Sequence, residues 1–263
     1  VSYSEFGFEI PSYYGVNFIA KGSLKIKELD RTVEPKIFQI TGIRGVPSTG
    51  ASVNAEVTRV HFAAEKAPAF KSENFVINPD ENRSSLKITM SEYMYPSMGE
   101  PKQVSRTWKD VTAEYLNRPN FLLELLAFEK LRSELPDSLI QIQDTTEKIN
   151  AITGYVKSRL RFTNDYSPTP TKKQKEILAL GAGNSADLNL VLLNFLKAAG
   201  LTAYPVFASQ RGNGLIDEKY ADIQRISTVL VAVKTSQGFE VRDATNAGLK
   251  NDLLPISLYN GKM

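Results

Sequence analysis

One long apolar stretch, residues 181–200, constrains the fold of this chain more than any other segment. It opens with glycines and with Asn184 and Ser185, which can cap the start of a helix. It ends at Gly200, a residue typical of the position just beyond a helix C-terminus. The residues between, LNLVLLNFL, are apolar on nearly every face, so a helix here has to be covered on all sides. The sequence therefore predicts a central helix buried within a domain.

The segments on either side of this helix predict a mixture of helices and strands. Strand-like runs follow it at residues 202–209, 228–235 and 239–245. Helical periodicity precedes it at residues 111–117, 121–135, 144–160 and 172–180. Thr145 or Thr146 is expected to cap the helix at 144–160. The second part of the chain is thus expected to be a buried helix that leads into a sheet.

The first part of the chain has the alternating and β-branched pattern of strands. These runs, separated by Gly, Pro, Asn and Asp, are residues 16–20, 24–29, 36–41, 55–62 and 85–93. Residues 43–54 and 67–82 are expected to be loops. Trp108, the one tryptophan, is expected to anchor the junction between the β part and the helices. The fold class is therefore α+β, with an antiparallel β-sandwich-like domain over residues 1–110 and a helix-plus-sheet domain over 111–263.

Composition excludes several classes of function. The net charge is only +3 and no long basic run occurs, so no nucleic-acid partner is expected. No apolar run reaches the length of a membrane span. The chain has no cysteine and a single histidine, His61, which removes thiolate chemistry and most metal sites. Acidic residues 217, 218 and 222 lack EF-hand spacing. We therefore expect neither a metal nor a cofactor.

The second part resembles a known superfamily in several motifs taken together. A helix over 147–160, a loop, the run GAGNSADLNLVLLNFLKAAGL, a strand and then FEVRDAT resemble the transglutaminase-like core. That family has a papain-like Cys-His-Asp triad, and the resemblance places Ser185 at the cysteine position, Thr228 at the histidine position and Asp243 at the aspartate position. Residues 68–116 resemble the end of an uncharacterised β-domain that precedes this core in Bacteroidetes-type envelope proteins. The resemblance implies export to the periplasm or outer surface. The chain begins at Val1 without a signal peptide, so it is expected to start partway into that β-domain.

The departures from the triad decide the expected function. A serine at position 185 needs a base to take its proton, and the hydroxyl of Thr228 does not titrate near neutral pH. Asp243 has no histidine to orient, and His61 lies in the β part. The sequence therefore predicts a catalytically inactive protein, a binding or scaffolding module of the bacterial cell envelope. Its expected partner is an envelope protein, a peptide or a glycan, bound through the loop at 210–226 by Arg211, Tyr220 and Arg225.

Two other interpretations stay open at this point. The chain can be a hydrolase or acyl transferase that uses Ser185 with an atypical base, such as a lysine or Asp187. It can also be a purely structural domain whose cleft is filled by its own side chains. In that case Ser185 is a helix cap, Thr228 an ordinary strand residue and Asp243 a turn former. A cleft plugged by side chains would favour the structural role over binding at the cleft.

Overall fold

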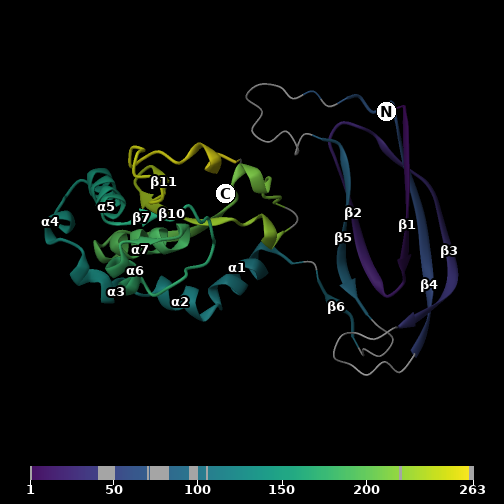
Figure 1. Cartoon of the computed structure of the whole chain (residues 1–263), viewed down its shortest axis with the longest axis horizontal. Coiled ribbons are helices and arrows are strands. Elements are labelled where there is room, and N and C mark those ends of the chain that lie inside the picture. Colours follow the sequence, from purple (N-terminus) through teal and green to yellow (C-terminus); the bar gives the residue numbers. More distant parts are fainter. Residues whose placement is uncertain are drawn as a thin grey trace. The chain divides into compact units, whose positions relative to one another are not determined.

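The computed structural model describes residues 2–40, 51–69, 71, 83–94, 100–104, 106–218 and 221–260. The chain is α+β, with antiparallel sheets, and it divides into two compact units, Val1–Arg106 and Thr107–Met263. The first unit is built from strands and the second carries the helices (Figure 1). No helix of the described residues is long and apolar enough to cross a membrane.

The first unit contains two three-stranded antiparallel sheets. One has the order β1 (Tyr3–Pro11), β4 (Ala51–Glu65), β3 (Ile26–Ile40). The other has the order β2 (Tyr14–Lys21), β5 (Ser85–Tyr93), β6 (Lys102–Gln103). Aromatic side chains join the two sheets: the ring of Phe18 in β2 lies 5.1 Å from that of Phe62 in β4 and 6.5 Å from that of Phe8 in β1. These offset and tilted contacts form the apolar interior of this unit.

The strands of this unit differ from the sequence expectation in three places. The runs predicted at 24–29 and 36–41 overlap one strand, β3, which contains residues 26–29 and 36–40 of them and passes a bulge between Glu28 and Asp30; residue 41 lies outside the described residues. The first residues of β4, 51–54, were expected to be loop; the rest of the expected loop at 43–54 and most of that at 67–82 lie outside the described residues. Strand β1 was not predicted, although Phe6, Phe8 and Ile10 alternate along it as strand residues do.

The second unit is organised around α7 (Ser185–Ala198), within the predicted central stretch. Every residue from Ser185 to Leu196 is buried. On one side α7 packs on the antiparallel sheet β11 (Gly238–Arg242), β10 (Thr228–Thr235), β9 (Ala203–Ala208), and these strands match the predicted runs. Helices cover it elsewhere (Figure 1): α2 (Pro119–Leu125), α3 (Phe128–Leu131), α5 (Thr145–Arg159) and α6 (Gln174–Leu180). Leu188, Leu192, Phe195, Ile152 and Val231 are among the buried side chains of this core.

Helix boundaries in this unit show tertiary contacts overriding local pattern. The predicted helix at 121–135 is broken after Leu125 into α2 and α3. In a continuous helix the carbonyl of Glu124 would accept from the amide four residues later. Instead it accepts from the side-chain amides of Gln174 and Asn194, each at 2.6 Å. The helix α5 is capped by Asp144, whose Oδ1 accepts from the amide of Glu147 at 2.7 Å, and not by Thr145 or Thr146.

Two further features complete this unit. Helix α1 (Trp108–Leu116) begins at the tryptophan, whose indole N–H donates to the carbonyl of Asp217 at 2.8 Å. Short parallel strands β7 (Arg161–Phe162) and β8 (Ala182–Gly183) pair between α5 and α7. Gly181 ends α6 with φ +67°, a left-handed conformation that glycine adopts without strain. The chain thereby turns sharply into β8, and Asn184, which follows β8, lies at the start of α7.

Candidate functional site

The first turn of α7 is fixed by a capping box. Asn184 is the N-cap, and its Oδ1 accepts from the amide of Asp187 at 2.8 Å. Asp187 returns the contact, since its Oδ2 accepts from the amide of Asn184 at 3.0 Å. Gly183 leaves room for this carboxylate, because a Cβ there would lie 2.6 Å from the Cβ of Asp187. The cap is thus Asn184, and Ser185, which was considered as a cap, is the first residue of the helix.

The hydroxyl of Ser185 is fully used by internal hydrogen bonds. It donates to the carbonyl of Ser167 at 2.9 Å and accepts from the amide of Ser167 at 2.9 Å. It also accepts from the hydroxyl of Thr228 at 2.9 Å. Ser185 and Thr228 both have 0% exposure. One donor and two acceptor positions are all that a serine hydroxyl offers, so none remains for a substrate.

The loop at 163–171 covers the start of α7 through backbone and side-chain contacts. The carbonyl of Asp165 accepts from the amide of Ser185 at 3.0 Å, and that of Thr169 accepts from the side-chain amide of Asn184 at 3.0 Å. Thr171 donates to the carboxylate of Asp187 with both its amide, at 2.8 Å, and its hydroxyl, at 2.7 Å. Free amides at a helix N-terminus are what would stabilise a thiolate or other anion. Here the Asp165 carbonyl of the loop occupies the Ser185 amide, and the Asn184 side chain occupies the Asp187 amide.

Asp243 directly follows β11, and its carboxylate forms hydrogen bonds with neither Ser185 nor Thr228 among the described contacts. Its Oδ1 accepts from the side-chain amide of Asn189 at 2.9 Å, and its Oδ2 from the amide of Thr245 at 3.2 Å and from the Thr245 hydroxyl. Asn189 also donates to the carbonyl of Val229 at 3.0 Å and accepts from the amide of Ala244 at 2.8 Å. The carboxylate is 1% exposed, and this burial raises its pKa. Asp243 therefore ties β11 to α7 and to the strand of Thr228.

The structure places the other predicted residues as follows. Arg211 donates from Nε to the carbonyl of Tyr259 at 3.0 Å, and Arg225 donates to the carbonyl of Asn213 at 2.5 Å. Both arginines thus hold their own loop and the C-terminal segment, whereas Tyr220 lies outside the described residues. His61, in the first unit, lies with Nδ1 3.6 Å from Glu5 and 3.7 Å from Asp30. No described group of His, Asp and Glu residues is arranged to hold a metal.

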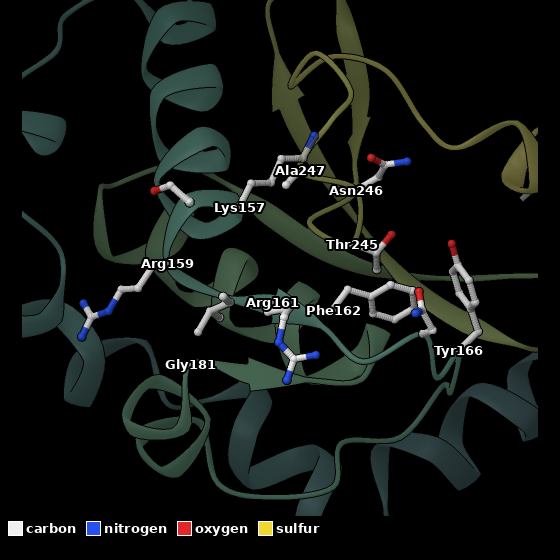
Figure 2. Close-up of a pocket in the computed structure, with 12 residues that line it drawn as sticks. Lys157, Arg159, Arg161, Phe162, Tyr166, Gly181, Thr245, Asn246 and Ala247 are labelled. Atoms are coloured by element: carbon white, nitrogen blue, oxygen red, sulfur yellow. The ribbon is translucent and has the colours of Figure 1, made fainter.

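An open cavity of about 550 Å³ lies between the end of α5, β7 and the turn after β11. Its wall includes Arg161, Phe162, Tyr166, Thr245 and Asn246. Thr245 is the residue that donates to Asp243, so the cavity adjoins one of the three predicted site residues. Figure 2 shows the Arg161 guanidinium in the centre of the view, with the rings of Phe162 and Tyr166 to one side of it. These rings are in edge contact with centroids 4.9 Å apart.

The cations of this wall differ in what they already bind. Lys157 donates to the carbonyls of Leu249 and Lys250 at 3.3 and 3.4 Å, and burial lowers its pKa. Arg159 donates to the Tyr155 hydroxyl and to Glu134, and it extends away from the other labelled residues (Figure 2). The exposed Arg161 side chain has no hydrogen bond or ion pair with any described residue. Among these three, Arg161 is the cation available to a ligand.

Sequence reasoning missed the residues that surround Ser185, Asp187 and Asp243. Ser167, Thr171 and Asn189 carry the contacts, and all three are ordinary polar residues of a loop or a helix. Their partners are separated by 16 to 54 positions along the chain, so no local spacing reveals them. Arg161 could have been noticed as a cation that follows the α5 helix directly and precedes a polar loop.

Comparison with known proteins gives similarity to two solved structures. One is described as a "putative protease" from Parabacteroides distasonis, with 14% identity and a TM-score of 0.45 over 97% of this chain and 45% of that chain. The other is described as a "putative cysteine protease" from Cytophaga hutchinsonii, with 11% identity and a TM-score of 0.36 over 98% of this chain and 86% of that chain. This chain therefore spans less than half of the Parabacteroides protein. No family model matches the chain, and no curated protein matches it. At these scores, the two similarities say nothing about activity.

Proposed function

We propose that this chain is a catalytically inactive transglutaminase-like protein with an N-terminal β-sandwich-like domain, acting as a binding module of the bacterial cell envelope. Its place would be the periplasm or the outer surface. The observation that carries the loss of catalysis is the Ser185 hydroxyl, which is buried and bonded to Ser167 and Thr228. A serine nucleophile needs a base within hydrogen-bond reach, and neither Ser167 nor Thr228 offers one.

The alternative of an unusual base finds no support at Asp187. Its two carboxylate oxygens accept from Thr171 and Asn184, whereas the Ser185 hydroxyl bonds to Ser167 and Thr228. A fluorophosphonate probe provides the test. We expect no covalent labelling of the native chain. Labelling that disappears in Ser185→Ala would establish a serine hydrolase and end this proposal.

Recognition would then take place in the cavity around Arg161, not at the triad positions. A free guanidinium binds a carboxylate through two parallel hydrogen bonds. Beside it, Phe162 and Tyr166 offer an apolar surface, and the exposed Asn246, whose Oδ1 accepts from the amide of Gly248, offers the donor of its side-chain amide. We infer that the ligand is an envelope peptide or glycan with a terminal carboxylate. This replaces Arg211 and Arg225 as the contacts, since neither lines this cavity.

A thermal-shift panel tests this recognition. Peptidoglycan fragments, acidic glycans and short peptides are titrated against the intact chain, because a ligand that binds only the native state raises the melting temperature. We expect a saturable shift with a carboxylate-bearing ligand that is lost in Arg161→Gln and kept in Arg211→Gln. The reverse pattern would place recognition on the loop at 210–226. Amidated peptides of the same sequence serve as the ligand control.

The purely structural role is the second candidate. The hydrogen bonds that occupy the Ser185 hydroxyl favour this role over ligand binding at Ser185. In that case the positions of Ser185, Thr228 and Asp243 serve only to join α7 to its sheet and its loop. A flat thermal response across the whole panel at millimolar ligand, with wild-type and Arg161→Gln chains alike, would favour this role.

A further inference from the structure

A second cavity, of about 820 Å³, lies in the same unit and has a different chemical character. It is bounded by α1, by the C-terminal end of α7, by the edge strand β9 and by the segment at 216–218. Its walls are mainly apolar, with Val111, Leu116, Phe207 and Ile226 among them. Cavities of roughly 300–1,000 Å³ with apolar walls and few polar groups are typical small-molecule sites.

One cation stands in this apolar wall. Lys197, in the last turn of α7, is half-buried, and burial lowers the pKa of its ammonium group. It forms no hydrogen bond or ion pair with the residues that the structure describes. The other charged residue of the wall, Glu218, forms no ion pair with it either. A partly desolvated cation without an acidic partner is complementary to an anionic group brought in by a ligand.

We propose that this cavity binds an amphiphile with a single aliphatic chain and an anionic headgroup, of the class of long-chain carboxylates. The chain would lie among Val111, Leu116, Phe207 and Ile226, and the carboxylate would meet Lys197 at the end of α7. An apolar cavity favours the chain because each methylene removed from water stabilises the complex. This site stands apart from the cavity of Arg161 and does not rest on the function proposed above.

The protein carries its own reporter for the test. Trp108 is the only tryptophan and lines this cavity, so its fluorescence reports on the cavity alone. The intact chain is titrated with 9,10-dibromostearate below its micelle concentration, since bromine quenches a tryptophan that it touches. We expect saturable quenching with a stoichiometry of one, reversed by unbrominated stearate. Over the series from decanoate to tetradecanoate, competition should tighten about fourfold for each added methylene.

Variants locate the two ends of the ligand. Leu116→Glu places a charge in the apolar wall and should abolish the saturable quenching, and a melting temperature within a few degrees of wild type would show that the fold is kept. Lys197→Gln should weaken the carboxylate about tenfold and leave the matching fatty alcohol unchanged. Lys234→Gln, at an exposed lysine of β10, is the control and should change neither.

The outcomes that overturn the proposal are equally definite. Quenching that never saturates, or that persists unchanged in Leu116→Glu, would mean adsorption elsewhere on the surface. Equal loss of carboxylate and alcohol in Lys197→Gln would remove the anionic headgroup from the assignment. Displacement by apolar peptides but not by stearate would assign the cavity to a protein partner.

Discussion

The start of α7 and the cavity beside β7 are both lined by the segment at 161–169, but the segment is bonded to the first region and leaves the second open. Asp165, Ser167 and Thr169 turn hydrogen-bonding groups to the start of α7, where each has a partner. Phe162 and Tyr166 line the open cavity, together with Arg161, whose guanidinium has no described partner. The polar groups of the first region are bonded to one another, whereas the second contains one cation, Arg161, that has no described partner. The difference teaches that one loop can close one region with its backbone and leave a cation exposed in the next.

The largest effect should follow from Asp187→Ala at the closed region. The change leaves three donors without an acceptor, the buried amide of Asn184 and the part-buried amide and hydroxyl of Thr171, which should cost about 3 kcal/mol. Urea denaturation of the variant and of wild type measures the change in the free energy of unfolding. The matched control is Asp165→Ala in the same loop, where only the backbone carbonyl contacts α7, and it should stay within about 0.5 kcal/mol of wild type. Equal effects of the two changes would show that the loop does not depend on this carboxylate.

Ser185→Ala should have the next largest effect on stability. It removes one hydroxyl that serves both backbone groups of Ser167 and the hydroxyl of Thr228, at a cost of about 2 kcal/mol. Ser236→Ala, in the exposed turn after β10, is the control and should be nearly neutral. A neutral Ser185→Ala would mean that the hydroxyl is not part of the internal network and would weaken the contrast between the two regions.

Asp243 gives the closed region a dependence on pH. Because burial raises the folded pKa above the ordinary value of 3.8, its contribution to stability is full below 3.8 and is lost as the pH rises through the folded pKa. The free energy of unfolding of wild type, relative to that of Asp243→Asn, should therefore decrease as the pH is raised from about 3.5 to about 7. Urea unfolding of the two chains at several pH values in this range provides the measurement. A relative increase would contradict the raised pKa of this buried carboxylate.

Arg161→Gln should have the smallest effect on stability. It therefore tests most sharply whether the cavity beside β7 differs from the start of α7. The exposed side chain has no described partner, so the free energy of unfolding should change by less than about 0.5 kcal/mol. Only the ligand-dependent shift in melting temperature should disappear. A loss of stability above that limit would show that the guanidinium serves the fold, as Arg159 does through Glu134.

Much of the second unit follows from the sequence, because α7 is buried on all faces and its apolar pattern leaves no alternative to a central helix. The strands of its sheet follow from their β-branched residues. The break between α2 and α3 does not follow, since it depends on Gln174 and Asn194 reaching the carbonyl of Glu124. Such contacts join residues far apart in the chain and leave no local signal.

Two of the three residues of the candidate site are joined in the structure, and what surrounds them could not be predicted from the sequence. The resemblance places Ser185, Thr228 and Asp243 near one another, and Ser185 does bond to Thr228. Whether the place is open depends on the loop at 163–171, which closes over α7 through Asp165, Ser167 and Thr171. Loop closure is set by backbone geometry, and the sequence of a polar loop does not encode it in any short pattern.

The most direct test of the closed triad site is the reactivity of a thiol placed there. The chain has no cysteine, so Ser185→Cys and the exposed Ser236→Cys each carry a single thiol. Both are treated with Ellman's reagent under native conditions and again in denaturant, where they should react alike. Because a buried, hydrogen-bonded group has to open before it reacts, the Ser185→Cys thiol should react at least ~1,000-fold more slowly in the native state. Reaction as fast as that of Ser236→Cys would show an accessible site and contradict the account.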